Sequence, residues 1–180
     1  MNKRVLCILA PGFEEIEAVT PVDLLRRAGA EVVLASLSGE KRVAGRCFML
    51  LETETSLEDV MSEDFDVLLL PGGPGVKVLR EDGRPAQLAR QFADAGKVVA
   101  AICAAPTVLE DAGVLADKRY TAHFSVNEEL PMALSGKKVV EDDNIITSRG
   151  AGTAIDFGLA LVKRLYGHDK AKEIAAAIMA

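Results

Sequence analysis

Three short segments of the chain are apolar at nearly every position, and they constrain the fold more than any other feature. They are residues 5–10 (VLCILA), 65–70 (FDVLLL) and 97–102 (KVVAAI). Successive side chains of a strand point to opposite faces, so a strand that is apolar throughout must be covered on both faces. Such strands are typical of a parallel sheet that lies between two layers of helices.

Helical segments separate these strands. The spacing of Ile16, Val19 and Leu24 predicts a helix over about 14–28, which ends at Gly29. The alternation of strands and helices predicts an α/β fold with a mostly parallel central sheet, in a single domain over 1–180. Further helices are predicted over 85–95, 104–112, 152–165 and 168–178, further strands over 31–37, 119–122, 138–141 and 144–147, and a hairpin or edge excursion within 41–55.

Charge and composition exclude several classes of function. The 180 residues carry a net charge of −6, which argues against nucleic-acid binding because that needs a basic surface. No apolar run approaches the roughly 18 residues of a membrane span, and the N-terminus lacks the pattern of a signal peptide. Three cysteines without CxxC spacing and two histidines without HxH or HExxH spacing indicate neither a disulfide framework nor a metal centre. We expect a cytoplasmic protein without a metal.

Residues with catalytic chemistry follow four of the predicted strands. Glu14, Glu15 and Glu17 follow the first, a glycine pair follows FDVLLL, Cys103 follows KVVAAI, and His123 follows residues 119–122. Ligand sites of open parallel sheets form beyond the carboxyl ends of the strands. The pattern therefore predicts one site that combines an acid, a backbone pocket, a thiol and an imidazole.

Cys103 is the candidate nucleophile because it lies at a tight junction between a strand and a helix. Small residues surround it, and Pro106 suits the first turn of a helix. The N–H dipoles of a helix N-terminus favour the thiolate, which predicts a lowered pKa. The alternative is a buried, inert cysteine. That interpretation applies to Cys7, within an apolar strand, while Cys47 is predicted to be a surface thiol.

The remaining candidates each have a structural alternative. Glu17 could complement a helix dipole, but as a buried, neutral acid it would hydrogen-bond the Cys103 thiolate. Backbone N–H groups of Gly72, Gly73 and Ala104 could form an oxyanion hole, or the glycines could serve only as turn residues. His123 is either a general base or a structural histidine, and His168 is predicted to lie on the surface.

Gly150-Ala151-Gly152 invites a dinucleotide-binding interpretation, but the third glycine of that motif is absent, since position 155 is Ile. The motif also falls too late in the chain for the rest of a dinucleotide-binding unit to follow it. We therefore predict no cofactor.

Four blocks of the sequence resemble a known family. PGFEEIEAVTPVDLLRRAG, DVLLLPGG, VVAAICAAPTVL and ITSRGAGTAIDFGLALV are similar to blocks of the ThiJ/PfpI superfamily, in the branch of the parkinsonism-associated protein DJ-one and its bacterial homologues. The resemblance covers essentially the whole chain. It implies a flavodoxin-like three-layer sandwich and a homodimer.

The resemblance also implies roles for individual residues. Glu14, Arg149 and Gly150 join the candidate set as residues beside the site. At the matching positions, Cys103 is the reactive cysteine, Glu17 the acid that hydrogen-bonds it, Gly72, Gly73 and Ala104 the backbone anion pocket, and His123 the histidine near the thiol.

At several positions the sequence differs from the superfamily's peptidases and amidotransferases, which weakens those functional interpretations. Its peptidases and chaperones of the PfpI type have a histidine directly after the nucleophile, where this chain has Ala104. Its amidotransferases pair the histidine with a glutamate two residues later, where this chain has Ser125. In the family, the dimer partner contributes an arginine near the site. This chain has no clear match for that arginine, because Cys47 aligns with its position and Arg46 precedes it.

Within this branch, the resemblance implies a cofactor-free glyoxalase or deglycase. Its substrates would be small reactive aldehydes, such as methylglyoxal and glyoxal, or their early adducts on proteins and nucleotides. The alternative is an oxidative-stress sensor or redox-regulated chaperone whose Cys103 becomes a sulfinate.

Overall fold

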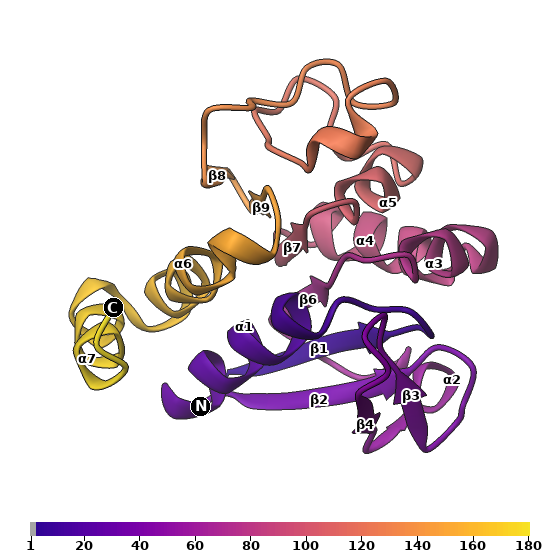
Figure 1. Ribbon diagram of the computed structural model, residues 1–180, viewed down its shortest axis with the longest axis horizontal. Coiled ribbons are helices and arrows are strands. Elements are labelled where there is room, and N and C mark those ends of the chain that lie inside the picture. The colour runs from indigo at the N-terminus through magenta and orange to yellow at the C-terminus, as the bar shows by residue number, and fades with distance from the viewer. Residues whose placement is uncertain (1–2) are drawn as a thin grey trace.

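The computed structural model describes residues 3–180, which build a mixed sheet of seven strands in the order β5-β2-β1-β6-β7-β9-β8 (Figure 1). All neighbouring strands of this sheet are parallel except β8 and β9. A separate antiparallel ribbon joins β3 (Arg42–Ala44) to β4 (Leu50–Glu52). The sheet strands are β1 (Arg4–Leu9), β2 (Glu31–Ser36), β5 (Thr55–Ser56), β6 (Val67–Leu70), β7 (Val98–Ile102), β8 (Val139–Asp142) and β9 (Ile145–Ser148).

Helices cover both faces of the sheet, which confirms the prediction of a mostly parallel, flavodoxin-like α/β sandwich. One face packs against α1 (Glu15–Arg27), α6 (Ala154–Tyr166) and α7 (His168–Ala177). The other packs against α2 (Leu57–Val60), α3 (Val76–Asp82), α4 (Arg84–Asp94) and α5 (Pro106–Asp111). Two short 3₁₀ helices, η1 (Phe124–Val126) and η2 (Ala151–Thr153), precede β8 and α6.

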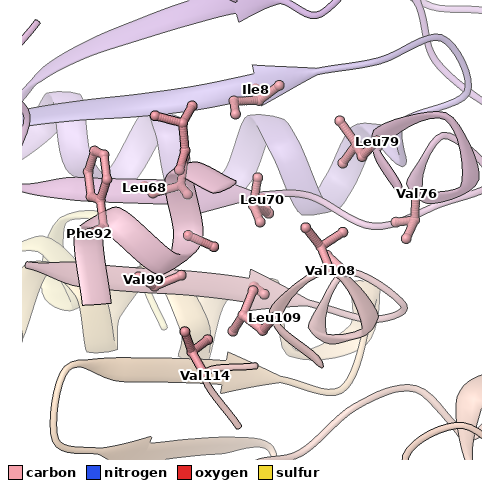
Figure 2. Packing of buried hydrophobic residues seen from close by; sticks show 14 of the residues in the cluster. Ile8, Leu68, Leu70, Val76, Leu79, Phe92, Val99, Val108, Leu109 and Val114 are labelled. Carbon is pink, nitrogen blue, oxygen red and sulfur yellow. The ribbon is translucent and has the colours of Figure 1, made fainter. Parts of the chain in front are cut away.

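The apolar strands are buried on both sides, as their composition predicts. In β1, Leu6 and Ile8 belong to the core beneath α2–α5, while Val5, Cys7 and Leu9 belong to the core beneath α1, α6 and α7. Figure 2 shows the first of these cores, where strand side chains such as Leu68 and Leu70 meet helix side chains such as Leu79 and Val108. Burying both faces fixes the register of the strands and so the place where each of them ends.

Three expectations are corrected. Residues 119–122 are not a strand, because the Thr121 N–H donates to the Thr147 hydroxyl (2.9 Å) instead of joining a backbone ladder. The helix expected from residue 104 begins at Pro106. Neither α2 nor α3 was expected, since each is short and buries only two side chains.

Across residues 3–180, no helix is both long enough and apolar enough to cross a bilayer.

Close packing between α1 and α6 depends on Gly158. A Cβ at this position would lie 2.7 Å from Leu24 Cδ1 and 3.1 Å from Pro21 Cα. Glycine inside a helix costs about 1 kcal/mol relative to alanine, so its presence here is explained by the approach of the two helices.

We therefore predict that Gly158→Ala lowers the free energy of unfolding by about 1–3 kcal/mol, because overpacking outweighs the gain in helix propensity. Urea unfolding measures the change. Gly136→Ala is the control, since a Cβ there meets nothing within 4 Å. A Gly158→Ala protein as stable as the wild type would contradict the packing argument.

Candidate functional site

A cleft of about 950 Å³ opens beyond the carboxyl ends of β1, β6 and β7. Glu17, Gly73, Cys103, Ala104 and His123 line it. Residues that are far apart in the sequence thus meet at the edge of the sheet that the strand pattern predicts.

Cys103 occupies a sharp turn between β7 and α5. Its φ of +67° is in the left-handed region, which is uncommon for a residue with a side chain. Two backbone hydrogen bonds hold the turn: the Cys103 N–H donates to the Ser148 carbonyl (2.9 Å), and the Cys103 carbonyl accepts from the His123 N–H (2.8 Å). Strained, over-determined backbone of this kind clusters at functional sites. The thiol is partly exposed to the cleft.

Glu17 is buried beside this thiol, with 1% of its surface exposed. Its Oε2 accepts a hydrogen bond from the Gly72 N–H (3.1 Å), and its carboxyl faces the Cys103 thiol and the Ala151 N–H. Burial raises the pKa of Glu17 to about 7, and the negative charge of Glu14 adds to this, while the hydrogen bonds oppose it. Glu17 is therefore a carboxyl group that carries a proton close to neutral pH.

The expectation of a lowered pKa for Cys103 is wrong. Burial, followed by the charge of Glu17, raises the pKa of the Cys103 thiol to about 12, and the N–H groups of Gly73 and Ala104 only partly offset this. The pair therefore carries one negative charge between about pH 7 and about pH 12. In that state a single proton resides either on sulfur or on the carboxyl, so the pair titrates as a unit.

The three acids that follow β1 have separate roles. Glu14 caps α1, since its Oε2 accepts from the Glu17 N–H (2.8 Å). Glu15 holds the turn between β3 and β4, because its Oε1 accepts from the Cys47 N–H (2.8 Å). Only Glu17 reaches the thiol, and Glu14 lines the same cleft.

The prediction that the Gly72 N–H contributes to an oxyanion hole is wrong, because this N–H already donates to Glu17. Its lack of a side chain is still required, since a Cβ would lie 2.4 Å from Glu17 Oε2 and 2.6 Å from Cys103 Cβ. Gly73, with φ of +91°, turns its N–H to the Cys103 sulfur, as does Ala104. These two N–H groups lower the pKa of the thiol.

His123 lies beside the pair with its ring orientation set by Ser125. Its Nδ1 accepts from the Ser125 N–H (3.2 Å) and lies 2.9 Å from the Ser125 hydroxyl. A backbone N–H can only donate, so a neutral His123 carries its proton on Nε2. Gly150 packs between the imidazole and the acid, since a Cβ there would lie 3.3 Å from His123 Cδ2 and 3.9 Å from Glu17 Oε1.

Arg149 is not brought into this cleft. It is exposed, and it lines a neighbouring hollow of about 470 Å³ with His123 and Gly150. Cys47 and His168 are exposed and Cys7 is buried, as predicted.

The sequence analysis missed Ala151, Ser125 and Arg80 as residues of the site. Ala151 follows Gly150, the last residue of the block ITSRGAGTAIDFGLALV that the resemblance places beside the site. Arg80 lies on α3, a helix that was not expected.

Comparisons with known proteins agree with this architecture. The model of the DJ-1/PfpI family matches residues 3–164. Protein dj-1beta of Drosophila melanogaster is 42% identical over 99% of this chain and 98% of its own. The glutathione-independent glyoxalase DJR-1.2 of Caenorhabditis elegans is 35% identical over 96% of this chain and 94% of its own.

Solved structures agree as well. The crystal structure of Drosophila melanogaster DJ-1beta superposes with a TM-score of 0.96 at 41% identity, over 99% of this chain and 98% of that one. Toxoplasma gondii DJ-1, described as oxidized, superposes with a TM-score of 0.93 at 34% identity, over 98% of each chain. Because sequence and fold agree over nearly its whole length, this chain belongs to the DJ-1/PfpI family.

Proposed function

We propose that the protein is a cysteine-dependent, cofactor-free glyoxalase or deglycase that acts on α-oxoaldehydes, such as methylglyoxal and glyoxal, or on their early adducts with proteins and nucleotides. The observation that carries the proposal is the buried Glu17 carboxyl beside the Cys103 thiol, with its pKa raised to about 7 by burial. A nucleophile paired with a proton carrier of pKa near 7 suits addition to a carbonyl followed by proton transfer. The glyoxalase named among the relatives supports it.

The first step is addition of the thiol to the aldehyde. Ionised Glu17 takes the Cys103 proton as the sulfur–carbon bond forms, and the carbonyl electron pair moves to oxygen. The N–H groups of Gly73 and Ala104 stabilise that oxyanion. Protonation of the oxygen gives a hemithioacetal.

The later steps move protons within the bound substrate. Removal of the proton from the former aldehyde carbon, with protonation of the neighbouring ketone oxygen, gives an enediol. Protonation of that neighbouring carbon, with loss of the hydroxyl proton from the sulfur-bearing carbon, gives a thioester of the 2-hydroxy acid. Glu17 and His123 are the groups beside the thiol that can carry these protons. Water then cleaves the thioester, which releases lactate from methylglyoxal and restores the thiol. The oxidation of one carbon is balanced by the reduction of its neighbour, so no external oxidant is needed.

A redox sensor or redox-regulated chaperone is the second candidate. A partly exposed Cys103 beside an acid suits stepwise oxidation, because protonated Glu17 can hydrogen-bond a sulfinate. The oxidized relative from Toxoplasma gondii favours this candidate. Peptidase and amidotransferase activities are less well supported, because Ala104 and Ser125 replace the residues those enzymes use.

We further propose that a second copy of the chain covers an exposed apolar surface. Ile16 and Val19 of α1 are 53% and 46% exposed, and Ile155 of α6 is 46% exposed. Ile16 and Ile155 line one hollow, Val19 and Leu51 of the β3–β4 ribbon line another, and Ile16 and Val19 are three residues apart on α1. Exposed apolar side chains that gather in this way mark interaction sites.

Cys103→Ser tests the nucleophile. We predict that wild type consumes methylglyoxal and forms lactate with a kcat/KM of roughly 10⁴ M⁻¹s⁻¹ or above, and that Cys103→Ser abolishes this. Cys47→Ser, which alters the exposed thiol, serves as the control and should keep the activity. A rate orders of magnitude lower, or equal in wild type and Cys103→Ser, would favour the sensor.

Glu17→Gln tests proton transfer. In wild type, kcat/KM should rise with pH through about 7, because Glu17 can accept the thiol proton only when it is ionised. Glutamine keeps the hydrogen-bonding capacity but cannot take a proton, so kcat/KM should fall by about 10²–10⁴-fold and lose this step. Oxidation of Cys103 by peroxide at alkaline pH should persist. Unchanged turnover would refute the role of Glu17.

Val19→Lys tests the second copy. Wild type should elute in light-scattering chromatography with twice the mass of the chain, and Val19→Lys with the mass of one chain, because a charged side chain at a buried interface is costly. Met132→Lys is the control, since Met132 is 75% exposed on the segment before β8. A monomeric wild type, or a Val19→Lys dimer, would count against the proposal.

A further inference from the structure

Arg80 joins three elements around the cleft through a network of ion pairs. It lies on α3, and its Nε and Nη2 donate to both oxygens of Asp111 at the end of α5 (2.7 and 2.9 Å). Its Nη1 donates to Glu129 Oε2 (2.6 Å). Arg80, Asp111 and Glu129 all line the cleft that contains Cys103. Isolated surface ion pairs contribute little to stability, but an arginine that binds a carboxylate in a bidentate way within a network is an exception.

Each joined element follows one part of the site along the chain. α3 follows Gly73, α5 follows Cys103, and Glu129 follows His123 by six residues. Arg80 therefore bonds to the segments that continue from the thiol and from the histidine, and lies itself on the helix that follows Gly73.

The segment that carries His123 has little regular structure. Between α5 and β8, the structure describes only the 3₁₀ helix η1. Two successive turns connect Glu129 to the histidine: the Glu129 N–H donates to the Val126 carbonyl (3.1 Å), and the Val126 N–H donates to the His123 carbonyl (3.1 Å). A displacement of Glu129 is thereby transmitted to η1, and with it to the Ser125 groups that bond His123 Nδ1.

We propose that Arg80 is a positioning residue that holds the imidazole of His123 in its orientation beside Cys103, by anchoring Glu129 against α3 and α5. The proposal rests on the proposed function for its kinetic test only. Arg80 acts on the reaction only through the His123 imidazole. The main chain of His123 is held separately, because its N–H donates to the Cys103 carbonyl.

The chain offers a matched control in Arg84. This arginine bonds both oxygens of Asp82 (2.7 Å each) and Glu58 (3.0 Å), and its side chain is 29% exposed against 32% for Arg80. It does not line the Cys103 cleft. A general loss of stability would affect both arginine variants, whereas a positioning effect is confined to Arg80.

The kinetic test compares Arg80→Met, Arg84→Met and His123→Ala with methylglyoxal as substrate. We expect Arg80→Met to lower kcat about five- to tenfold with little change in KM, and Arg84→Met to leave both unchanged. In the His123→Ala background, Arg80→Met should cause no further loss. Additive losses would overturn the proposal, and so would a raised KM with unchanged kcat, which would mean that Arg80 binds substrate.

A second readout does not depend on activity. His123 and His168 are the only histidines of the chain, so their imidazole nitrogens can be followed by ¹⁵N NMR. Wild type should show His123 protonated on Nε2 alone when neutral, Arg80→Met should show a mixture of tautomers, and Arg80→Lys should recover part of the wild-type signal. Arg84→Met and the signals of His168 should not change.

Identical His123 spectra in wild type and Arg80→Met would overturn the positioning role even in an active enzyme. Altered spectra with no methylglyoxal turnover in wild type would instead support the positioning role and refute the proposed function. The two failures are thus distinguishable.

Discussion

The contact between the buried Glu17 carboxyl and the Cys103 thiol is the interaction on which the rest of the site depends. Glu17 reaches the thiol because α1 begins directly after β1, with Glu14 capping the helix. Gly72 leaves the space that the carboxyl occupies, since a Cβ there would lie 2.4 Å from Glu17 Oε2. The strained turn at Cys103 points the sulfur at the acid and at the N–H groups of Gly73 and Ala104. The sheet, α1 and the glycines together place the Glu17 carboxyl and the Cys103 thiol within reach of one another.

Holding an acid in this way costs stability, and the cost has a defined pH dependence. The pKa of Glu17 rises from its ordinary value of 4.5 to about 7 on folding. The folded state then binds more protons than the unfolded state between these values, so stability falls as pH rises through this window, by about 3 kcal/mol for the full shift. A carboxyl retained at such a cost is expected of a functional group rather than of a structural one.

Much of the fold could be predicted from local sequence, and less of the site. Apolar strands such as 5–10 and 97–102 identify the parallel sheet, and the carboxyl ends of its strands bring Glu17 and Cys103 together. His123 follows no strand and is placed by the bond of its N–H to the Cys103 carbonyl. The direction of the Cys103 pKa shift could not be predicted, because it depends on burial and on a carboxylate 86 residues away in sequence. The Gly72 N–H was misassigned because its partner, Glu17, lies 55 residues away. Arg80 was missed because α3 has too few buried residues for a helical pattern.

The most direct test of the shared proton is a pH titration of the Glu17 carboxyl by difference infrared spectroscopy, with Glu17→Gln to assign the band. The account predicts that the band of the protonated acid persists far above pH 4.5 and disappears at about pH 7 or higher. Absorbance of the Cys103 thiolate, recorded alongside, reports where the remaining proton resides. Loss of the acid band near its ordinary pKa of 4.5 would contradict the account, because Glu17 would then have no proton to share at neutral pH.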